Sequence, residues 1–178
     1  MLDSRVLPLR GSRAVLRVMR PDDASAYASG TTDPAVRRYA HLPEPEYTEA
    51  SVTALVHGTI RDGLKRGDLA VLTVADPATD AFAGSLVLFG TQQDSAEVGF
   101  WVHPDHRGEG VARAALGLGI EFAGRSGLVR LTARTAPENR ASQRVLEQAG
   151  FIKGETTRDL APSGQEVALV HYLCDIAP

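Results

Sequence analysis

Apolar and polar residues alternate in several segments of the chain, and in others the apolar residues recur every three or four positions. Alternation is typical of strands with one buried face, and the longer period is typical of amphipathic helices. The alternating segments predict strands over residues 14–20, 69–76, 81–90, 96–102, 128–135, 151–160 and 166–174. The others predict a short helix that begins at Pro21 and longer helices over 48–66, 108–125 and 139–150.

The order of these elements predicts a mixed α/β (α+β) fold rather than a doubly wound one. Short turns join the three strands between residues 69 and 102, which predicts an antiparallel meander. The strand–helix–strand unit from Glu97 to Ala136 predicts one parallel pair, because a parallel connection needs a crossover. The last two strands predict a hairpin around Pro162, Ser163 and Gly164.

Composition narrows the class of protein. A chain of 178 residues with 43% hydrophobic and 23% charged residues is expected to fold as one domain, 1–178. Its net charge of −3 argues against nucleic acid as the main partner. No segment has the ~20 apolar residues of a membrane span or the pattern of a secretory leader, so we expect a cytoplasmic protein without a membrane partner.

The cysteine and the histidines predict no metal site. The single cysteine, Cys174, excludes an internal disulfide and is expected to be a small buried residue. The five histidines have no spacing typical of metal ligands; His103 and His106 flank a Pro-Asp pair and are expected to be loop residues. We therefore expect no metal cofactor.

A glycine turn at residues 107–113 predicts an anion site. Glycines let consecutive backbone N–H groups converge, and the N-terminus of the following helix adds partial positive charge. Arg113 lies in the first helical turn, which is unfavourable for a cation unless an anion is bound there. The segment lacks the Gly-Lys-Ser/Thr of a Walker A loop and the third glycine of a dinucleotide fingerprint. The alternative is a turn that needs glycine only for its tight geometry.

These residues resemble a known superfamily. The segment "VHPDHRGEGVA" resembles motif A of the GNAT N-acetyltransferases, with Arg107, Gly110 and Ala112 at its defining positions. The segment "ENRASQRVLEQAGF" is similar to motif B of the ribosomal-protein N-terminal acetyltransferase (RimJ/RimL-like) branch. "AEVGFWV" and "LRVMRPDDA" also resemble strands of that branch, so the resemblance covers Ala14 to Tyr172. It implies a mixed, mostly antiparallel sheet flanked by helices, with parallel central strands that splay apart.

The resemblance also implies a binding site for acetyl-CoA, with its pyrophosphate on the glycine turn and its pantetheine arm between the splayed strands. A backbone N–H near Trp101 or Val102 would polarise the thioester carbonyl. The implied cofactor-binding residues are Phe100, Trp101, Val102, Arg107, Gly108, Glu109, Gly110, Val111, Ala112, Arg113 and Asn139.

Four residues, Asn139 among them, carry open alternatives. Asn139 is also a good helix N-cap. Gly99 fits a bulge or a close backbone approach, and equally a strand position that faces a large neighbour. Gly117 and Gly119 weaken their helix, which close packing on the sheet would explain.

For catalysis the resemblance implies direct attack of an amine on the thioester in a ternary complex, so Cys174 is not a nucleophile. We predict Glu97 as the base and Ser142 as the acid, since Leu146 stands where many superfamily members carry a tyrosine. The alternatives are an exposed charge at a strand end for Glu97 and a helix-capping role for Ser142.

The predicted acceptor is a small-molecule amine or a peptide N-terminus. Its pocket is expected between the loop Tyr39–Tyr47, which carries Glu44 and Glu46, and the final hairpin, with Tyr172 as a contact. Alternative functions are a non-catalytic acyl-CoA-binding regulatory module, a transferase for another acyl-CoA such as succinyl-CoA, and an enzyme for a different phosphate ligand. Both a monomer and a homodimer are compatible with the sequence.

Overall fold

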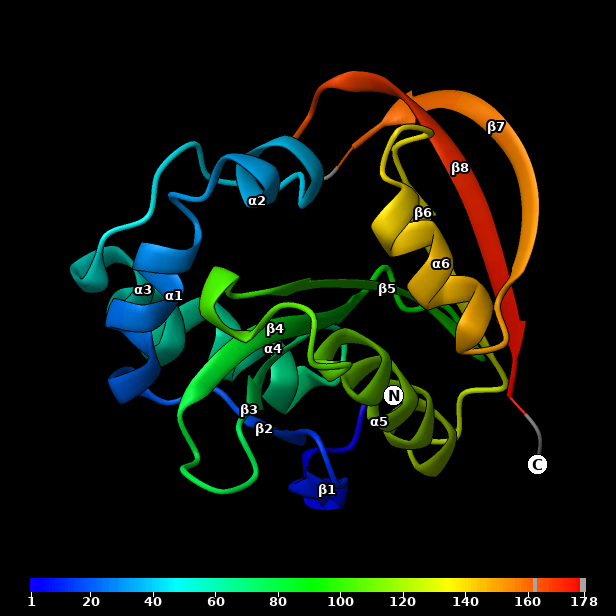
Figure 1. The fold of residues 1–178 in the computed structure, drawn as a ribbon. Helices are drawn as coiled ribbons and strands as arrows, with labels where there is room; N and C mark the ends of the chain where they lie inside the picture. Colours follow the sequence, from blue (N-terminus) through cyan, green and yellow to red (C-terminus); the bar gives the residue numbers. More distant parts are fainter. Residues whose placement is uncertain (162, 177–178) are drawn as a thin grey trace.

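The computed structural model describes residues 1–161 and 163–176, and its strands form one eight-stranded sheet in the order β1-β2-β3-β4-β5-β6-β8-β7 (Figure 1). The strands are β1 (Leu9–Arg10), β2 (Val15–Val18), β3 (Ala70–Ala75), β4 (Phe82–Phe89), β5 (Ser95–Val102), β6 (Arg130–Thr135), β7 (Ile152–Leu160) and β8 (Glu166–Asp175). The α-helices are α1 (Ala24–Gly30), α2 (Pro34–Tyr39), α3 (Glu49–Leu55), α4 (Arg61–Arg66), α5 (Val111–Arg125) and α6 (Arg140–Gln148). Neighbouring strands are antiparallel except for β5 and β6, which are parallel. The predicted mixed sheet is thus confirmed.

Some boundaries differ from the prediction. The two-residue strand β1 and the six-residue helix α2 were not predicted. The helix predicted over 48–66 contains a π-helical segment at Val56–Ile60, where Gly58 has non-helical angles of φ −117° and ψ −105°. The helix predicted from Gly108 begins at Val111, because Gly108 and Gly110 have left-handed backbone angles. For the turn predicted around Pro162, Pro162 itself lies outside the described residues.

The sheet has a hydrophobic cluster on each face. Residues of α5 and α6, such as Leu116, Phe122 and Leu146, belong to the first cluster, and residues of α1 and α3 belong to the second. Strand β5 alternates between them, since Ala96 and Val98 lie in the first cluster and Trp101 in the second. Cys174 is buried in the first cluster, as predicted.

The two glycines of α5 differ in their surroundings. A Cβ atom at Gly119 would lie 2.8 Å from a side-chain carbon of Leu86 on β4, so this glycine allows the helix to pack closely on the sheet. A Cβ atom at Gly117 would meet nothing within 4 Å, so the same prediction is wrong there. Gly117 instead lies at the wall of a cavity.

The central strands separate partway along their length. Ser95, Ala96 and Glu97 of β5 pair with Arg130, Leu131 and Thr132 of β6. Beyond Glu97, β5 continues to Val102 beside β4, while β6 continues to Thr135 beside β8. Among the described residues no further β5–β6 pair is formed, so the predicted splay is confirmed.

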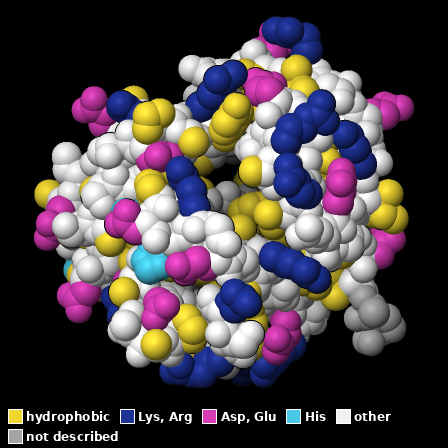
Figure 2. Space-filling view, viewed as in Figure 1, with side chains coloured by type: hydrophobic (Ala, Val, Ile, Leu, Met, Phe, Trp, Pro, Cys, Tyr) yellow, Lys and Arg dark blue, Asp and Glu magenta, His cyan; other side chains and the backbone are white. Residues whose placement is uncertain are grey.

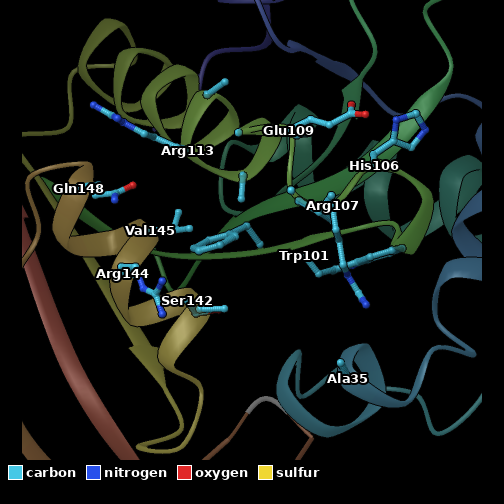
Figure 3. A pocket seen from close by; sticks show the side chains of 18 of the residues that line it. Ala35, Trp101, His106, Arg107, Glu109, Arg113, Ser142, Arg144, Val145 and Gln148 are labelled. Atoms are coloured by element: carbon cyan, nitrogen blue, oxygen red, sulfur yellow. The ribbon is translucent and has the colours of Figure 1, made fainter.

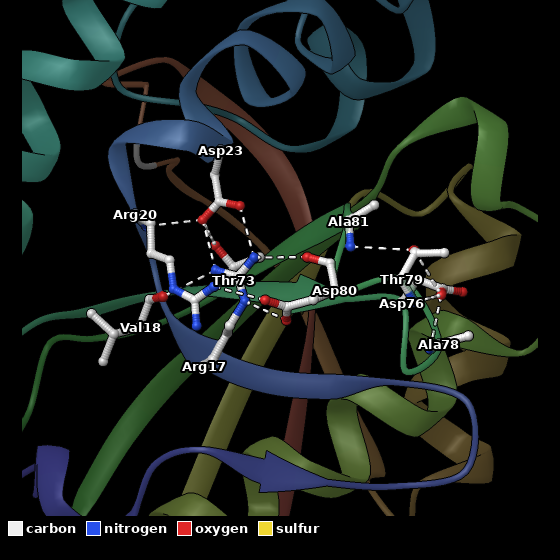
Figure 4. Close-up of polar contacts among 10 residues, drawn as sticks. All are labelled: Arg17, Val18, Arg20, Asp23, Thr73, Asp76, Ala78, Thr79, Asp80 and Ala81. Atoms are coloured by element: carbon white, nitrogen blue, oxygen red, sulfur yellow. Dashed lines mark hydrogen bonds and ion pairs between the residues drawn. The ribbon is translucent and has the colours of Figure 1, made fainter.

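A buried ion pair fixes the turn that leads from β2 into α1 (Figure 4). The guanidinium of Arg17 donates to both carboxylate oxygens of Asp23 at 2.8 and 2.9 Å, and both side chains are almost completely buried. Asp23 also accepts from the backbone N–H of Arg20 and the hydroxyl of Thr73, each at 2.8 Å. Arg17 further donates to Asp80, in the turn between β3 and β4. The network thus joins three segments that are distant in sequence.

Candidate active site

Two cavities meet where β5 and β6 separate. The larger has a volume of about 1150 Å³ and lies between the glycine turn, α2, α5 and α6 (Figures 2 and 3). The smaller has a volume of about 500 Å³ and lies over the β3, β4 and β5 strands. Residues that line both are Tyr39, Ala40, Phe100, Trp101 and Ser142. Molecules bound in the two cavities would therefore come into contact at this junction.

The glycine turn forms one wall of the larger cavity. Gly108 and Gly110 have φ values of 82° and 78°, and Gly110 is the N-cap of α5. Only glycine adopts this conformation at little cost, and it turns the backbone into the helix N-terminus. All the residues predicted to bind the cofactor line this cavity: Phe100, Trp101, Val102, Arg107, Gly108, Glu109, Gly110, Val111, Ala112, Arg113 and Asn139. Their binding role remains a prediction.

The larger cavity is strongly basic. Its lining includes four arginines, Arg13, Arg107, Arg113 and Arg144, and a single acidic residue, Glu109. In Figure 3, Arg113 extends from α5 and Arg144 from α6 on the same side of the cavity. Such a lining favours a ligand with several negative charges.

Two of these arginines have defined partners. Arg107 forms an ion pair of 2.6 Å with Asp33, the N-cap of α2, and hydrogen bonds from Arg107 hold the pKa of Asp33 below its usual value. Arg13 donates to the backbone carbonyl of Glu109 at 2.8 Å and so supports the glycine turn. Arg13 was not predicted, because it is distant from the turn in sequence. Arg144 was not predicted either, although Ala141, Arg144 and Gln148 recur at helical spacing along α6.

The free edge of β5 presents backbone groups to the gap. His103 donates its N–H to the carbonyl of Ala83, which directs that N–H towards β4. Because backbone groups alternate between the two edges of a strand, the N–H of Trp101 also faces β4, and those of Phe100 and Val102 face the gap. Of the two residues considered for the oxyanion site, this geometry favours Val102. The side chain of Trp101 packs edge-on against Tyr27 in the core.

Ser142 has an ordered environment at the junction. Asn139 caps α6 by accepting the N–H of Ser142 at 3.2 Å, and it donates from its side-chain amide to the Ser142 hydroxyl at 2.9 Å. The N-cap of α6 is thus Asn139, and capping does not explain Ser142. Because the Ser142 oxygen accepts from Asn139, its own proton is free to be donated to a ligand.

Glu97 lies in the smaller cavity beside Arg134, a cation that was not predicted from the sequence. The Nε atom of Arg134 donates to Oε1 of Glu97 at 2.9 Å, and both side chains are about one-fifth exposed. The ion pair fixes the carboxylate at the cavity wall. His41 also lines this cavity, and burial, followed by the positive charge of Arg134, lowers the pKa of its imidazole. His41 is therefore neutral at pH 7.

The loop between α2 and α3 lines the smaller cavity as predicted, through residues that include His41, Leu42, Glu44 and Tyr47. Glu46 is outside this lining and lies 3.9 Å from Arg37. The prediction for Tyr172 is wrong, because its side chain is buried in the first cluster and donates to Glu147, away from both cavities. Burial and Glu147 raise the pKa of its hydroxyl to about 12.

Gly99 faces a large neighbour. A Cβ atom there would lie 3.2 Å from a methyl group of Val87, and β5 pairs with β4 without a bulge around it. Among the described residues, no group of three or more histidines, cysteines or acids could hold a metal ion. Within the same residues, no helix is long and apolar enough to cross a membrane.

The fold thus combines a sheet that splits between β5 and β6 with a basic, glycine-lined cavity that adjoins a smaller one. Residues 13–152 match the family model described as an acetyltransferase (GNAT) domain. The chain therefore belongs to the GNAT acetyltransferase family and is an N-acetyltransferase, which confirms the recognition made from its motifs.

Individual relatives are similar to this chain at modest identity. An uncharacterized N-acetyltransferase, p20 of Bacillus licheniformis, is 27% identical over 150 residues, which cover 83% of each chain. The structure of Mycobacterium smegmatis RimJ in complex with CoA-disulfide is similar with a TM-score of 0.80 and 23% identity, covering 91% of this chain and 81% of RimJ. The ribosomal-protein-S5-alanine acetyltransferase of Vibrio fischeri has a TM-score of 0.81 and 16% identity, covering 96% of this chain and 97% of that one.

Proposed function

We propose that this acetyltransferase transfers the acetyl group of acetyl-CoA to a primary amine by direct attack within a ternary complex. The observation that carries the proposal is the meeting of a basic, glycine-lined cavity with a second, smaller cavity at Ser142 and the free edge of β5. The first has the character that a pyrophosphate requires, and the second has the volume typical of a small-molecule site. The CoA bound to the similar RimJ structure supports the donor.

The residues of the larger cavity fit acetyl-CoA. The N–H groups of the glycine turn and the N-terminus of α5 favour the pyrophosphate, and Arg107, Arg113 and Arg144 supply positive charge. The N–H groups of Phe100 and Val102 on the free edge of β5 bind the pantetheine amides and the thioester carbonyl oxygen. In the proposed complex the reacting carbon lies at the junction of the cavities.

The acid–base chemistry falls to Glu97 and Ser142. Glu97 removes a proton from the amine, directly or through a water, as the nitrogen bonds to the thioester carbon. The Val102 N–H stabilises the negative charge on the carbonyl oxygen. As the carbon–sulfur bond breaks, the Ser142 hydroxyl donates its proton to the departing sulfur. The proton held by Glu97 restores the serine hydroxyl through solvent, leaving the N-acetylated amine and free CoA.

The acceptor class is tested by release of free thiol from acetyl-CoA. The panel contains short peptides with different N-termini, free amino acids, polyamines and aminoglycosides. The peptides are included because the V. fischeri enzyme of the same fold is named for a protein alanine. Calorimetry measures acetyl-CoA binding in parallel. Thiol release that requires one amine class supports the proposal, and binding without release on any amine contradicts it.

Ser142→Ala is expected to lower kcat by on the order of 100-fold with little change in the Kd of acetyl-CoA, because only the departing sulfur loses a donor. Steady-state kinetics and calorimetry check this. Ser126→Ala is the matched control, since the Ser126 hydroxyl also lies at a helix end but bonds to the N–H of Asp3, outside both cavities. Equal kcat in Ser142→Ala and wild type would remove Ser142 from the mechanism.

Glu97→Gln is expected to lower kcat/KM for the amine by on the order of 100-fold, because the amide retains the shape of glutamate but not its basicity. Glu138→Gln is the control, because Glu138 is half-exposed and lies 3.8 Å from Arg38. Kinetics at saturating acetyl-CoA measure both variants. If Glu97→Gln behaved like Glu138→Gln, the base would have to be another group or water.

A further inference from the structure

The smaller cavity has one polar end, on β5, β6 and α6, and one apolar end, on β3, β4 and α3. Glu97 of β5, Arg134 of β6 and Ser142 of α6 line the polar end, and Ser142 also lines the larger cavity. At the apolar end, β3 and β4 contribute Val71 and Val87 to the floor, and Leu55 of α3 and Ile60 of the π-helical segment also line it. Polar chemistry and apolar surface are thus separated along the cavity, which constrains how an acceptor is oriented.

The floor is built from side chains in register across three strands. Val71 of β3 pairs with Val87 of β4, and Val87 pairs with Gly99 of β5. Phe89, the next residue of β4 on the same face, pairs with Glu97. Because Gly99 has no side chain, the side of Val87 that faces β5 is open to the cavity, although a Cβ atom at Gly99 would lie 3.2 Å from a Val87 methyl group. An apolar group therefore finds both contact surface and space there.

The apolar side chains at this end are only partly covered by protein. Leu55, Val71, Val87 and Phe89 are all of intermediate exposure, although each lies on a helix or strand beside a hydrophobic cluster. Their remaining exposed surface therefore faces the cavity. Ser85, the polar residue on the same face of β4, donates its hydroxyl to the carbonyl of Leu72 at 3.2 Å and needs no ligand partner.

The charges of the cavity do not match a polycation. Glu97 is paired with Arg134, and His41 is neutral at pH 7, which leaves the exposed Glu44 as the one acid of the described lining without a cationic partner. A polyamine would place a second or third positive charge on the apolar floor, where this single exposed carboxylate would be the only compensation among the described lining residues. A single amine at the Glu97 end meets no such penalty.

We propose that the acceptor is a primary amine attached to a bulky apolar group, aryl or branched alkyl, which lies on the floor formed by Val71, Val87 and Gly99. This inference rests on the proposed acetyltransferase function and names its substrate class. The amine lies at the junction, close to Glu97 and Ser142, and the apolar group points towards α3. Two sources share this chemistry: a free arylalkyl or branched alkylamine, and a peptide whose first residue has a large apolar side chain.

The test compares kcat/KM across paired acceptors at saturating acetyl-CoA, with thiol release as the readout. Free phenethylamine and isopentylamine are compared with ethanolamine and spermidine, and peptides beginning with Phe or Leu with otherwise identical peptides beginning with Ser or Ala. The apolar member is expected to exceed its polar counterpart by about 30-fold, because even one methylene in an apolar pocket changes kcat/KM by roughly 10–200-fold. The source with the higher kcat/KM distinguishes a free amine from a peptide N-terminus.

Substitutions in the floor separate this inference from a general preference for apolar amines. Val71→Asn is expected to raise KM for phenethylamine about tenfold or more, with the Kd of acetyl-CoA unchanged. Val71→Thr, which keeps the shape of valine, is expected to have a smaller effect in the same direction. Val18→Asn, at a half-exposed valine on β2 outside both cavities, is the control and is expected to match wild type.

The outcomes distinguish this inference from the proposed function. Preferred turnover of spermidine, ethanolamine or Ser-initiated peptides would overturn the apolar acceptor and leave the acetyltransferase mechanism intact. Equal effects of Val71→Asn on phenethylamine and ethanolamine would overturn the floor as the binding surface. Acetyl-CoA binding without thiol release on any amine would contradict the proposed function, and the inference would fall with it.

Discussion

Gly110→Glu is expected to abolish binding of acetyl-CoA. Gly110 is the N-cap of α5 with φ at 78°, and its position at the wall of the basic cavity would bring a new carboxylate beside the pyrophosphate. A like charge at such a contact costs several kcal/mol, and every 1.4 kcal/mol is a tenfold change, so Kd is expected to rise by at least about 100-fold. Calorimetric titration with acetyl-CoA measures the change.

Gly127→Glu is the matched control for this variant. Gly127 follows α5 at its other end with φ at 85°, and a Cβ atom there meets nothing within 4 Å. The control therefore has the same added charge and the same left-handed backbone, but outside both cavities. Both variants are expected to lose some stability, and only Gly110→Glu is expected to lose binding. Wild-type affinity in folded Gly110→Glu would contradict the placement of the pyrophosphate at the glycine turn.

Periodicity predicted the long elements of the fold, because repeated burial along one face leaves a pattern in sequence. The shortest elements leave little pattern, since β1 has two residues and α2 has six. The dipeptide Asp33-Pro34 contained the signal for α2, because proline suits the first helical position and Asp33 accepts two N–H groups as the N-cap. The helix over 48–66 is interrupted at Gly58, whose non-helical angles glycine tolerates, so the signal for this interruption was the glycine inside the helical pattern.

The candidate site was also predicted only in part from the sequence. The glycine turn is contiguous in sequence, so its motif predicted a set of residues that the structure brings to one cavity. Arg13 and Arg134 reach the site only through the tertiary fold, and neither belongs to a recognisable motif. The choice between Trp101 and Val102 also required the register with β4, because register decides which N–H groups face the gap.

Asp23→Ala is expected to destabilise the protein by about 3–5 kcal/mol, because it leaves the buried guanidinium of Arg17 without its main partner. Arg17 would retain its contact to Asp80, whose side chain is about half-exposed and compensates poorly for the loss. Denaturant unfolding at pH 7 measures the difference. The control is Asp68→Ala, which removes an exposed ion pair with Arg66 and is expected to leave the free energy of unfolding nearly unchanged.

Asp23 is also expected to make the free energy of unfolding depend on pH. Burial alone would raise the pKa of Asp23, but hydrogen bonds from Arg17, the Arg20 N–H and Thr73 outweigh it and hold the pKa below 3.8. Since the unfolded chain binds this proton first as pH falls, the contribution of Asp23 is complete above about pH 3.8 and is lost as pH falls through the folded-state pKa. The gap in stability between wild type and Asp23→Ala should therefore narrow in acid.

A double substitution distinguishes the contribution of the charge interaction between Arg17 and Asp23 from the contribution of their packing. Replacing both partners, Arg17→Met with Asp23→Leu, is expected to cost less than Asp23→Ala alone, because no buried charge is left unpaired. Unfolding of the double variant and of each single variant at pH 7 completes the cycle. A cost in the double variant equal to the sum of the single costs would show that the two side chains act independently, and the turn into α1 would then owe its position to packing rather than to this pair.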